Sequence, residues 1–427
     1  MDNDLEKYTL GEGVELIAVP VGRFKTNEIS ISFATALHPQ HAAANALALR
    51  VIASVSRSYP TPSALSRELA YLYGADLQPL IMKSGASQVL SLGLTCIDDR
   101  YSMDAQSIGA QAAALLCDLI FHPRLQEDGQ FFQEDVNREK EQLIQQICAE
   151  ENDKRVYAYH RLEEEMFRGE PCSVSRFGTA EQVAALTPAD VREALTRLVE
   201  TAKVVVTVVG SCGVGQIKDL FADAFSAVPR RYAAPPVVAA ASAPEEPRFV
   251  TDRENVKQGK LVLGFRVDCA PDSAFAPAVR SAADVFGGGP YSKLFANVRE
   301  KMSLCYYCSA RYVRAMRAVI VQCGCEEKNM EKAVKEILTQ LAEVQKGNCE
   351  NEFASSKAGI GDTLLSVYDT PQGLETWYLS QIADGDYKSP RTAAEENGAV
   401  TFEDVQRAAG LLKLDTVYRL VSAKEAE

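Results

Sequence analysis

The sequence predicts an α+β fold with two homologous domains, each a mostly antiparallel sheet packed with helices. Three observations predict it. The 427 residues are too many for one hydrophobic core and suit two domains. Within each half of the chain, β-rich runs and helical patterns come in separate groups, as is typical of α+β proteins. The order of these patterns in the first half also returns in the second, which indicates a duplicated domain.

The boundary between the predicted domains lies in the segment PRRYAAPPVVAAASAPEEPRF, residues 229–249. This segment is rich in Pro and Ala and has no helical periodicity, which is typical of a linker. We therefore expect an N-terminal domain at residues 1–228 and a C-terminal domain at residues 250–427.

In the first half, VELIAVP and EISISFA alternate between apolar and polar residues as strands do. From 131 to 168, apolar residues recur three and four positions apart, which predicts a long helix that residues 151–153 could interrupt. The other predicted elements are β-rich runs at 75–83 and 86–96, an amphipathic helix at 101–121 and a closing β-rich segment at 203–210.

The second half repeats this order. Ser63-Ala-Leu65 precedes Arg67-Glu68 in the first half, and Ser292-Lys-Leu294 precedes Arg299-Glu300 in the second. The predicted elements that follow are β-rich runs at 303–313 and 317–325, an amphipathic helix at 327–345 and a closing β-rich segment at 416–422.

Charge and hydropathy exclude several classes of partner. The net charge of −13 argues against nucleic acids and anionic membranes, which attract clustered Lys and Arg. The start, MDNDLEKYTLGEG, has neither the basic residues nor the apolar run of a signal peptide. No stretch approaches the ~20 apolar residues of a membrane span. The sequence thus predicts a cytoplasmic protein without a membrane span.

Residues 41–75, HAAANALALRVIASVSRSYPTPSALSRELAYLYGA, carry a degenerate motif. They resemble the start of an insulinase/pitrilysin-type metallopeptidase, in which H-x-x-E-H on a helix supplies two zinc ligands and a general base. Counting back from Pro60, the three motif positions fall on Ala46, Leu49 and Arg50. Aliphatic side chains offer zinc no ligand atom, and an arginine cation repels it.

The third ligand of that family is also replaced. In active members, a later helix carries two Glu separated by six residues, and the second Glu binds zinc. The matching residues here are Glu139 and Gln146, and a neutral amide is a poor zinc ligand. The run Tyr157-Ala-Tyr-His-Arg161 resembles a bacterial branch that lacks the zinc motif and tends to be encoded beside a sibling that keeps it. The resemblance thus implies no metal in this chain.

The segment GGGPYSKLFANVREKMSLCYY resembles the family's C-terminal segment, in which Arg and Tyr seven residues apart face the substrate. These residues map to Arg299 and Tyr306. A guanidinium and a phenol can donate hydrogen bonds to a peptide carbonyl, which supports a role in substrate binding. The alternative is that Arg299 makes a surface ion pair and that Tyr306 packs in the sheet.

Eleven cysteines are scattered along the chain, which suits reduced, mostly structural thiols. Cys305-x-x-Cys308 and Cys323-x-Cys325 lie on adjacent predicted strands. Residues three apart in a regular strand point to opposite faces, so Cys305 and Cys308 could share a metal only across a bulge. We therefore expect structural cysteines here.

The resemblance implies a catalytically silent metallopeptidase homologue with two domains that enclose a chamber. Such a chain would complete the chamber of a zinc-bearing sibling and help to position peptide, in a heterodimer or a homodimer. The zinc would belong to the partner chain. A stand-alone peptide-binding or scaffold homodimer is the alternative, and an active peptidase with a displaced metal is a third hypothesis.

Overall fold

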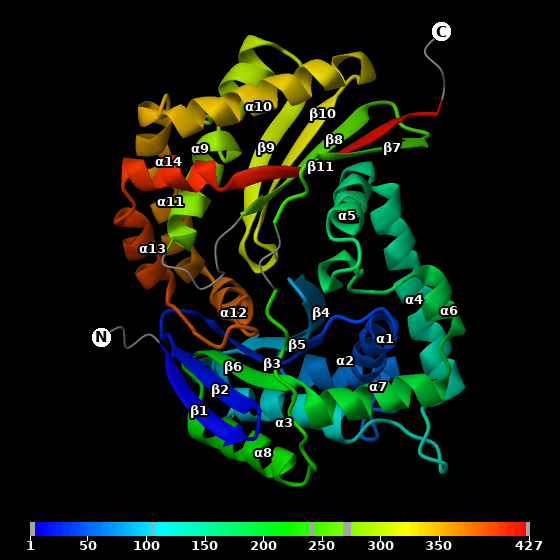
Figure 1. Ribbon diagram of the computed structural model, residues 1–427. Coiled ribbons are helices and arrows are strands. Elements are labelled where there is room, and N and C mark those ends of the chain that lie inside the picture. Colours follow the sequence, from blue (N-terminus) through cyan, green and yellow to red (C-terminus); the bar gives the residue numbers. More distant parts are fainter. Residues whose placement is uncertain (1–4, 104–105, 239–241, 268–274, 424–427) are drawn as a thin grey trace. The chain divides into compact units, whose positions relative to one another are not determined.

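The computed structural model describes residues 5–103, 106–238, 242–267 and 275–423 (Figure 1). The chain forms two compact units. Unit 1 consists of Met1–Cys148, Val174–Val237 and Val367–Ser389, and unit 2 of Ala149–Ser173, Val238–Ser366 and Pro390–Glu427. Each unit therefore includes one segment that comes from the other half of the chain.

Unit 1 is built on a mixed sheet. Its strands are β1 (Glu6–Gly11), β2 (Val14–Pro20), β3 (Thr26–Ala36), β4 (Asp76–Ser84), β5 (Ser87–Ile97) and β6 (Lys203–Gly210). Their spatial order is β1-β2-β6-β3-β5-β4, with β2 and β6 parallel and the other neighbours antiparallel. The Val-rich strand β6 is buried along its whole length, as expected for a strand with both faces covered.

Helices cover both faces of the unit 1 sheet. They are α1 (Ala42–Ile52), α2 (Pro62–Tyr71), α3 (Ile108–Phe121), α4 (Gln133–Asn152, whose last turn falls in unit 2), α6 (Ala180–Ala185), α7 (Pro188–Thr201), α8 (Val214–Ser226) and α12 (Pro371–Leu379). Helices α1, α3, α7 and α8 bury one face in the larger core. Helix α12 covers the other face, where Leu374 and Tyr378 pack with Ile17 and Val205.

Unit 2 has a similar sheet. Its strands are β7 (Arg248–Glu254), β8 (Gly259–Val267), β9 (Cys305–Val313), β10 (Ala318–Cys325) and β11 (Leu412–Ser422). The order β7-β11-β8-β10-β9, with β7 and β11 parallel, repeats the order β2-β6-β3-β5-β4 of unit 1. The predicted fold class is thus confirmed: two α+β units with mostly antiparallel sheets and the same strand order.

Helices also cover both faces of the unit 2 sheet. They are α5 (Lys154–Met166), α9 (Ala276–Gly287), α10 (Met330–Lys346), α11 (Glu350–Ser366), α13 (Pro390–Gly398), α14 (Phe402–Gly410) and a π-helix at Leu294–Lys301. Helices α9, α10 and α14 pack on one face. Helix α5 packs on the other, where Leu162 and Met166 meet Val262 and Tyr418.

The long helix predicted over 131–168 is two helices. Asp153 separates α4 from α5, and its carboxylate accepts hydrogen bonds from the backbone N–H groups of Arg155 and Val156. An acidic N-cap satisfies donors that have no partner inside the helix, so it favours a new helix start at this point. The break falls inside the interval 151–153 that the sequence indicated.

A buried ionic cluster holds the end of α5 on its sheet. Asp415, with no exposed surface, lies at a register shift in β11 and pairs with Arg248 at 2.6 Å and Arg266 at 2.8 Å. Arg266 also donates to the backbone carbonyl of Met166 at 2.8 Å and pairs with Glu170 at 2.6 Å. The cluster thus joins β7, β8 and β11 to the carboxyl end of α5.

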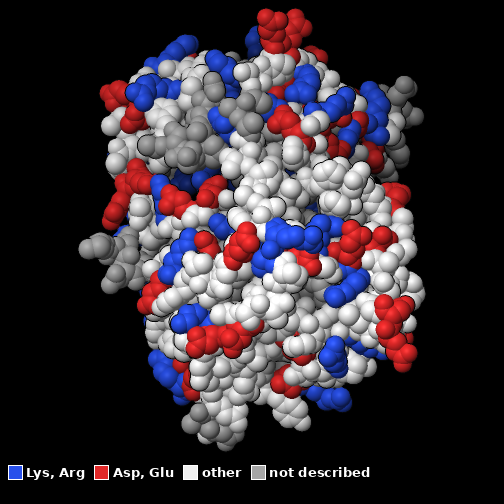
Figure 2. Space-filling model, turned by 60° about the horizontal axis from the view of Figure 1, so that its bottom comes forward, with Lys and Arg blue, Asp and Glu red and all other residues white. Residues whose placement is uncertain are grey.

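The surface carries charges of both signs. On the face shown in Figure 2, Lys and Arg side chains are interspersed with Asp and Glu side chains. Across the described part of the chain, every helix is too short or too polar to cross a membrane.

Candidate functional site

The first candidate site lies where α1 faces α4 in unit 1. Helix α1 reads AAANALALRVI, and its Ala and Leu residues favour a helix and form an apolar face. Ala46 is fully buried and Leu49 is 2% exposed, so both belong to the core. Arg50, in the last turn, is the polar member of this set.

Arg50 is held by three side chains of α4. Its Nη1 donates to Oε1 of Gln146 at 3.1 Å, and its Nη2 donates to Oε1 of Gln142 at 2.9 Å. Its Nε lies 3.6 Å from a carboxylate oxygen of Glu139, which is 5% exposed and also pairs with Arg138 at 3.2 Å. The structure therefore brings together Arg50 and Gln146, which the sequence placed at two ligand positions.

These residues do not fit a zinc ion. Ala46 and Leu49 have no ligand atom, Gln146 offers a neutral amide oxygen, and Arg50 is a cation already bound to that oxygen. Glu139 is the acid that remains, and its partners are two guanidinium groups. A permanent positive charge thus lies among the positions where the family motif would gather negative and neutral ligands around zinc.

The second candidate site lies in unit 2. Arg299 is on the π-helix Leu294–Lys301, and Tyr306 is on the edge strand β9. Both line a pocket of about 400 Å³ together with Glu300, Glu326 and Asn329. The structure thus brings the predicted pair into one pocket, and that pocket offers donors and acceptors for a polar ligand.

Both parts of the pair are accessible. The Arg299 guanidinium stacks on the ring of Phe295 at 4.6 Å and pairs with Glu300 at 3.4 Å. The side chain of Tyr306 is 72% exposed and therefore does not pack in the sheet. The alternative interpretation expected a surface ion pair at Arg299 and a packed Tyr306. The ion pair with Glu300 is present, but Tyr306 is exposed.

A group of thiols that the sequence predicted to be structural lies beside this pocket. The β9–β10 register shifts between Cys325, which pairs with Cys305, and Gly324, which pairs with Tyr307. Tyr306 is therefore the extra residue of a β-bulge. A regular strand would place Cys305 and Cys308 on opposite faces, and this bulge is the exception that the sequence allowed, because it turns both toward Cys323. Hydrogen bonds from the thiols of Cys308 and Cys323, helped by the charge of Arg299, lower the pKa of Cys305.

A family model and a related protein both indicate an inactive metallopeptidase homologue. The sequence model of the family described as the peptidase M16 inactive domain matches residues 185–360. The chain is 30% identical over 420 residues to the probable inactive metalloprotease YmfF of Bacillus subtilis, and the match covers 97% of each protein.

Solved structures of other bacterial proteins share the fold of this chain. A conserved protein from Enterococcus faecalis V583 superposes with a TM-score of 0.90 at 27% identity, and the match covers 100% of both chains. A protease from Helicobacter pylori superposes with a TM-score of 0.82 at 14% identity, covering 97% of this chain and 99% of the other, which shows a shared fold.

Proposed function

The chain belongs to the M16 peptidase family as a homologue of a probable inactive metalloprotease, and we propose that it completes the peptide-binding chamber of a zinc-bearing sibling. In this role the chain helps to bind and position peptide that the sibling cuts. The observation that carries the proposal is the contact between Arg50 and Gln146 at 3.1 Å.

This contact bears on catalysis because family hydrolysis needs a metal that activates water and polarises the scissile carbonyl. A guanidinium bound by two amides and a carboxylate does neither, because it has no exchangeable ligand position and no basic lone pair. We therefore expect no hydrolysis by this chain alone. Its family fold would still offer sheet edges to a peptide.

Within the described part of the chain, the two sheets have four edge strands, β1 and β4 in unit 1 and β7 and β9 in unit 2. Of these, β4 and β9 adjoin the candidate sites and can accept a peptide strand there. In the described residues, β4 pairs with β5 alone, and β9 pairs with β10 alone. Their outer N–H and C=O groups can form ladder hydrogen bonds with an extended peptide. Strand β4 contacts α1, the helix of the degenerate motif. Pro79 in β4 has no N–H group, so a peptide there would gain donors only on either side of it.

Strand β9 combines an edge with the Arg299 and Tyr306 pocket. A bound peptide could receive backbone hydrogen bonds from β9 and side-chain hydrogen bonds from the guanidinium and the phenol. The exposure of Tyr306 supports this role, because a phenol free of packing can turn toward a ligand. Arg299 and Tyr306 are thus the residues that we assign to substrate binding.

The alternative is a peptide-binding scaffold that pairs with itself and takes part in no hydrolysis. It uses the same pocket and the same edges. The two proposals differ in the partner: the scaffold pairs with a second copy of this chain, whereas the first proposal requires a zinc-bearing sibling.

The test is gentle isolation of the tagged chain from its own host, followed by identification of bound proteins and assay of peptide hydrolysis. We expect a stoichiometric partner of similar size that contains H-x-x-E-H, and hydrolysis only when both chains are present. Recovery of the chain only with itself would favour the scaffold. Hydrolysis that chelators abolish and that survives purification of this chain to homogeneity would refute the inactive assignment.

A further inference from the structure

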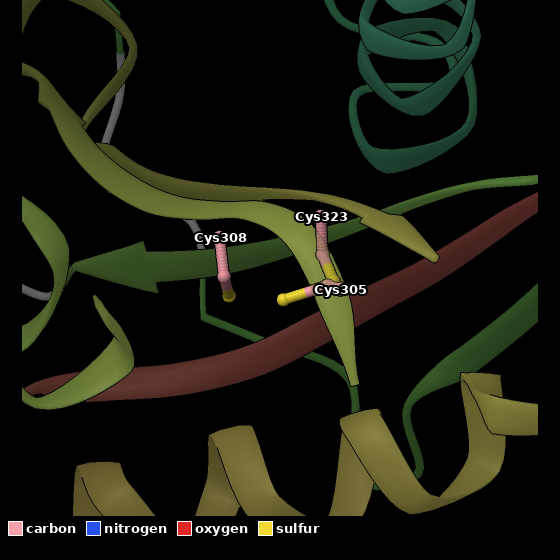
Figure 3. A group of neighbouring side chains, drawn as sticks. All are labelled: Cys305, Cys308 and Cys323. Atoms are coloured by element: carbon pink, nitrogen blue, oxygen red, sulfur yellow. The ribbon is translucent and has the colours of Figure 1, made fainter. Parts of the chain in front are cut away.

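Three cysteine thiols of unit 2 converge on one point. The sulfur atoms of Cys305, Cys308 and Cys323 all lie within 4.8 Å of one another. Figure 3 shows the side chains of Cys305 and Cys308 pointing toward each other beside Cys323. Within the described residues, this is the one group of three His, Cys, Asp or Glu side chains close enough to hold a metal ion.

The backbone builds this convergence in two ways. Cys308 and Cys323 are direct partners in the antiparallel β9–β10 ladder, so their side chains lie on the same face. Cys305 joins them because the bulge at Tyr306 adds one residue between it and Cys308. Bulges re-aim side chains, and here the bulge turns a third thiol toward a cross-strand pair.

The surroundings suit a bound ion with an entry path. Cys308 is 5% exposed and Cys323 is fully buried, both in the core between the sheet and its helices. Cys305 is partly exposed and lines the same pocket as Arg299. A small ion can therefore reach the thiols from that pocket, and the nearby guanidinium offsets part of the negative charge of three thiolates.

We propose that Cys305, Cys308 and Cys323 bind a Zn²⁺ ion as three thiolates, with a water from the pocket as the fourth ligand. Zinc favours thiolate ligands and tetrahedral geometry. Zn–S bonds of about 2.3 Å in a tetrahedron place sulfur atoms about 3.8 Å apart. The observed limit of 4.8 Å leaves only small side-chain rotations to reach that spacing. Binding releases the thiol protons to solvent and involves no change of oxidation state.

This site is separate from the degenerate motif on α1, and it does not depend on the proposed peptide binding. It lies on the sheet of the other unit, and its ligands are sulfur instead of histidine and carboxylate. X-ray absorption distinguishes sulfur ligands from nitrogen and oxygen ligands, so this site can be tested independently of the proposed function.

The experiment adds Zn²⁺ to the reduced full-length chain, removes free ion by dialysis and measures the metal retained. We expect one equivalent, and X-ray absorption at the zinc edge should find three sulfur neighbours. Co²⁺ in place of zinc should show thiolate-to-metal charge-transfer absorption. Cys308→Ser and Cys323→Ser should each weaken zinc binding at least tenfold. Two control variants should leave zinc binding unchanged. Cys349→Ser changes a buried thiol of unit 2, and Cys148→Ser changes an exposed thiol of unit 1.

Three results would overturn the proposal. The first is retention of full zinc by folded Cys308→Ser and Cys323→Ser variants. The second is a zinc spectrum of the unmodified chain without sulfur neighbours, which decides the question even if the variants fail to fold. The third is absence of zinc binding after reduction, with a disulfide between two of these cysteines in the protein as isolated.

Discussion

The guanidinium of Arg50 donates a hydrogen bond of 3.1 Å to the side-chain amide of Gln146, across the interface of α1 and α4. The family motif would place a zinc ligand at each of these two positions. The contact shows that the two positions face each other. The side chain at the first position, Arg50, bonds directly to the side chain at the second, Gln146. A direct hydrogen bond thus joins the two helices at positions where the family motif would have zinc ligands.

Replacing Arg50 should destabilise unit 1. Arg50→Ala removes the bonds to Gln142 and Gln146 and leaves Glu139 with Arg138 as its remaining cation, which should cost about 1–3 kcal/mol. Chemical denaturation measures this loss. Gln146→Ala should cost less because Gln146 is exposed. Equal stability of Arg50→Ala and the unmodified chain would show that the contact contributes nothing.

Restoring the motif should restore a metal site. The variant Ala46→His, Leu49→Glu, Arg50→His, Gln146→Glu should be less stable than the parent without metal, because Ala46 and Leu49 are buried among apolar side chains. Zinc should raise its melting temperature by binding the folded state. The measurement belongs in a Cys308→Ser background, which removes one ligand of the proposed thiolate site. A melting temperature insensitive to zinc would contradict the assigned positions.

The packing of α12 on its sheet should depend on pH. Glu28 on β3 accepts from Thr95 and Gln372, and burial raises its pKa from 4.5 to about 7. Burial also raises the pKa of Glu375 on α12. A raised pKa means that the folded state favours the protonated acid, so this contribution to stability is complete below pH 4.5 and is lost as pH rises through 7.

Glu28→Gln tests this dependence. The variant should exceed the unmodified chain in stability at pH 8 by up to about 3 kcal/mol, and should match it at pH 4.5. Denaturant titrations at the two pH values measure both differences. A variant that is less stable than the parent at pH 8 would show that the ionised carboxylate contributes to folding.

Breaking the buried ionic cluster should strongly destabilise unit 2. Asp415→Ala leaves Arg248 and Arg266 without their shared carboxylate, which should cost about 3–5 kcal/mol. Lys328→Ala is the matched control in the same unit, because it breaks an exposed pair with Glu326 and should cause no measurable change. Thermal unfolding of both variants compares them. Similar melting temperatures would show that the cluster is not a major stabilising contact.

Arg299 and Tyr306 should affect peptide binding without affecting stability. Tyr306→Phe removes one hydroxyl donor, and loss of a hydrogen bond worth about 1 kcal/mol lowers affinity about fivefold. The melting temperature should not move because Tyr306 is 72% exposed. Arg299→Ala should act in the same direction, and Arg253→Ala, at an exposed site in the same unit, should not. Titration with labelled peptide measures the affinities, and unchanged binding in both pocket variants would remove these residues from the site.

Much of the fold could be predicted because periodicity is a local property. The strand predicted at 203–210 is β6 at Lys203–Gly210, since a short run of β-branched Val residues favours a buried strand. The strands predicted at 75–83 and 86–96 are β4 and β5 with ends one residue later. The amphipathic helix predicted at 101–121 begins later, at Ile108 of α3, after the N-cap Ser107.

The sequence by itself determined the fold class and the absence of an H-x-x-E-H motif, because periodicity and side-chain chemistry are properties of each residue and its neighbours. The tertiary structure alone decided which helix covers the second face of each sheet: α12 on the unit 1 sheet and α5 on the unit 2 sheet. It also decided the partners of Arg50 and the convergence of three thiols at the Tyr306 bulge. These contacts join residues far apart in the chain or depend on one residue of register, and no local pattern specifies either.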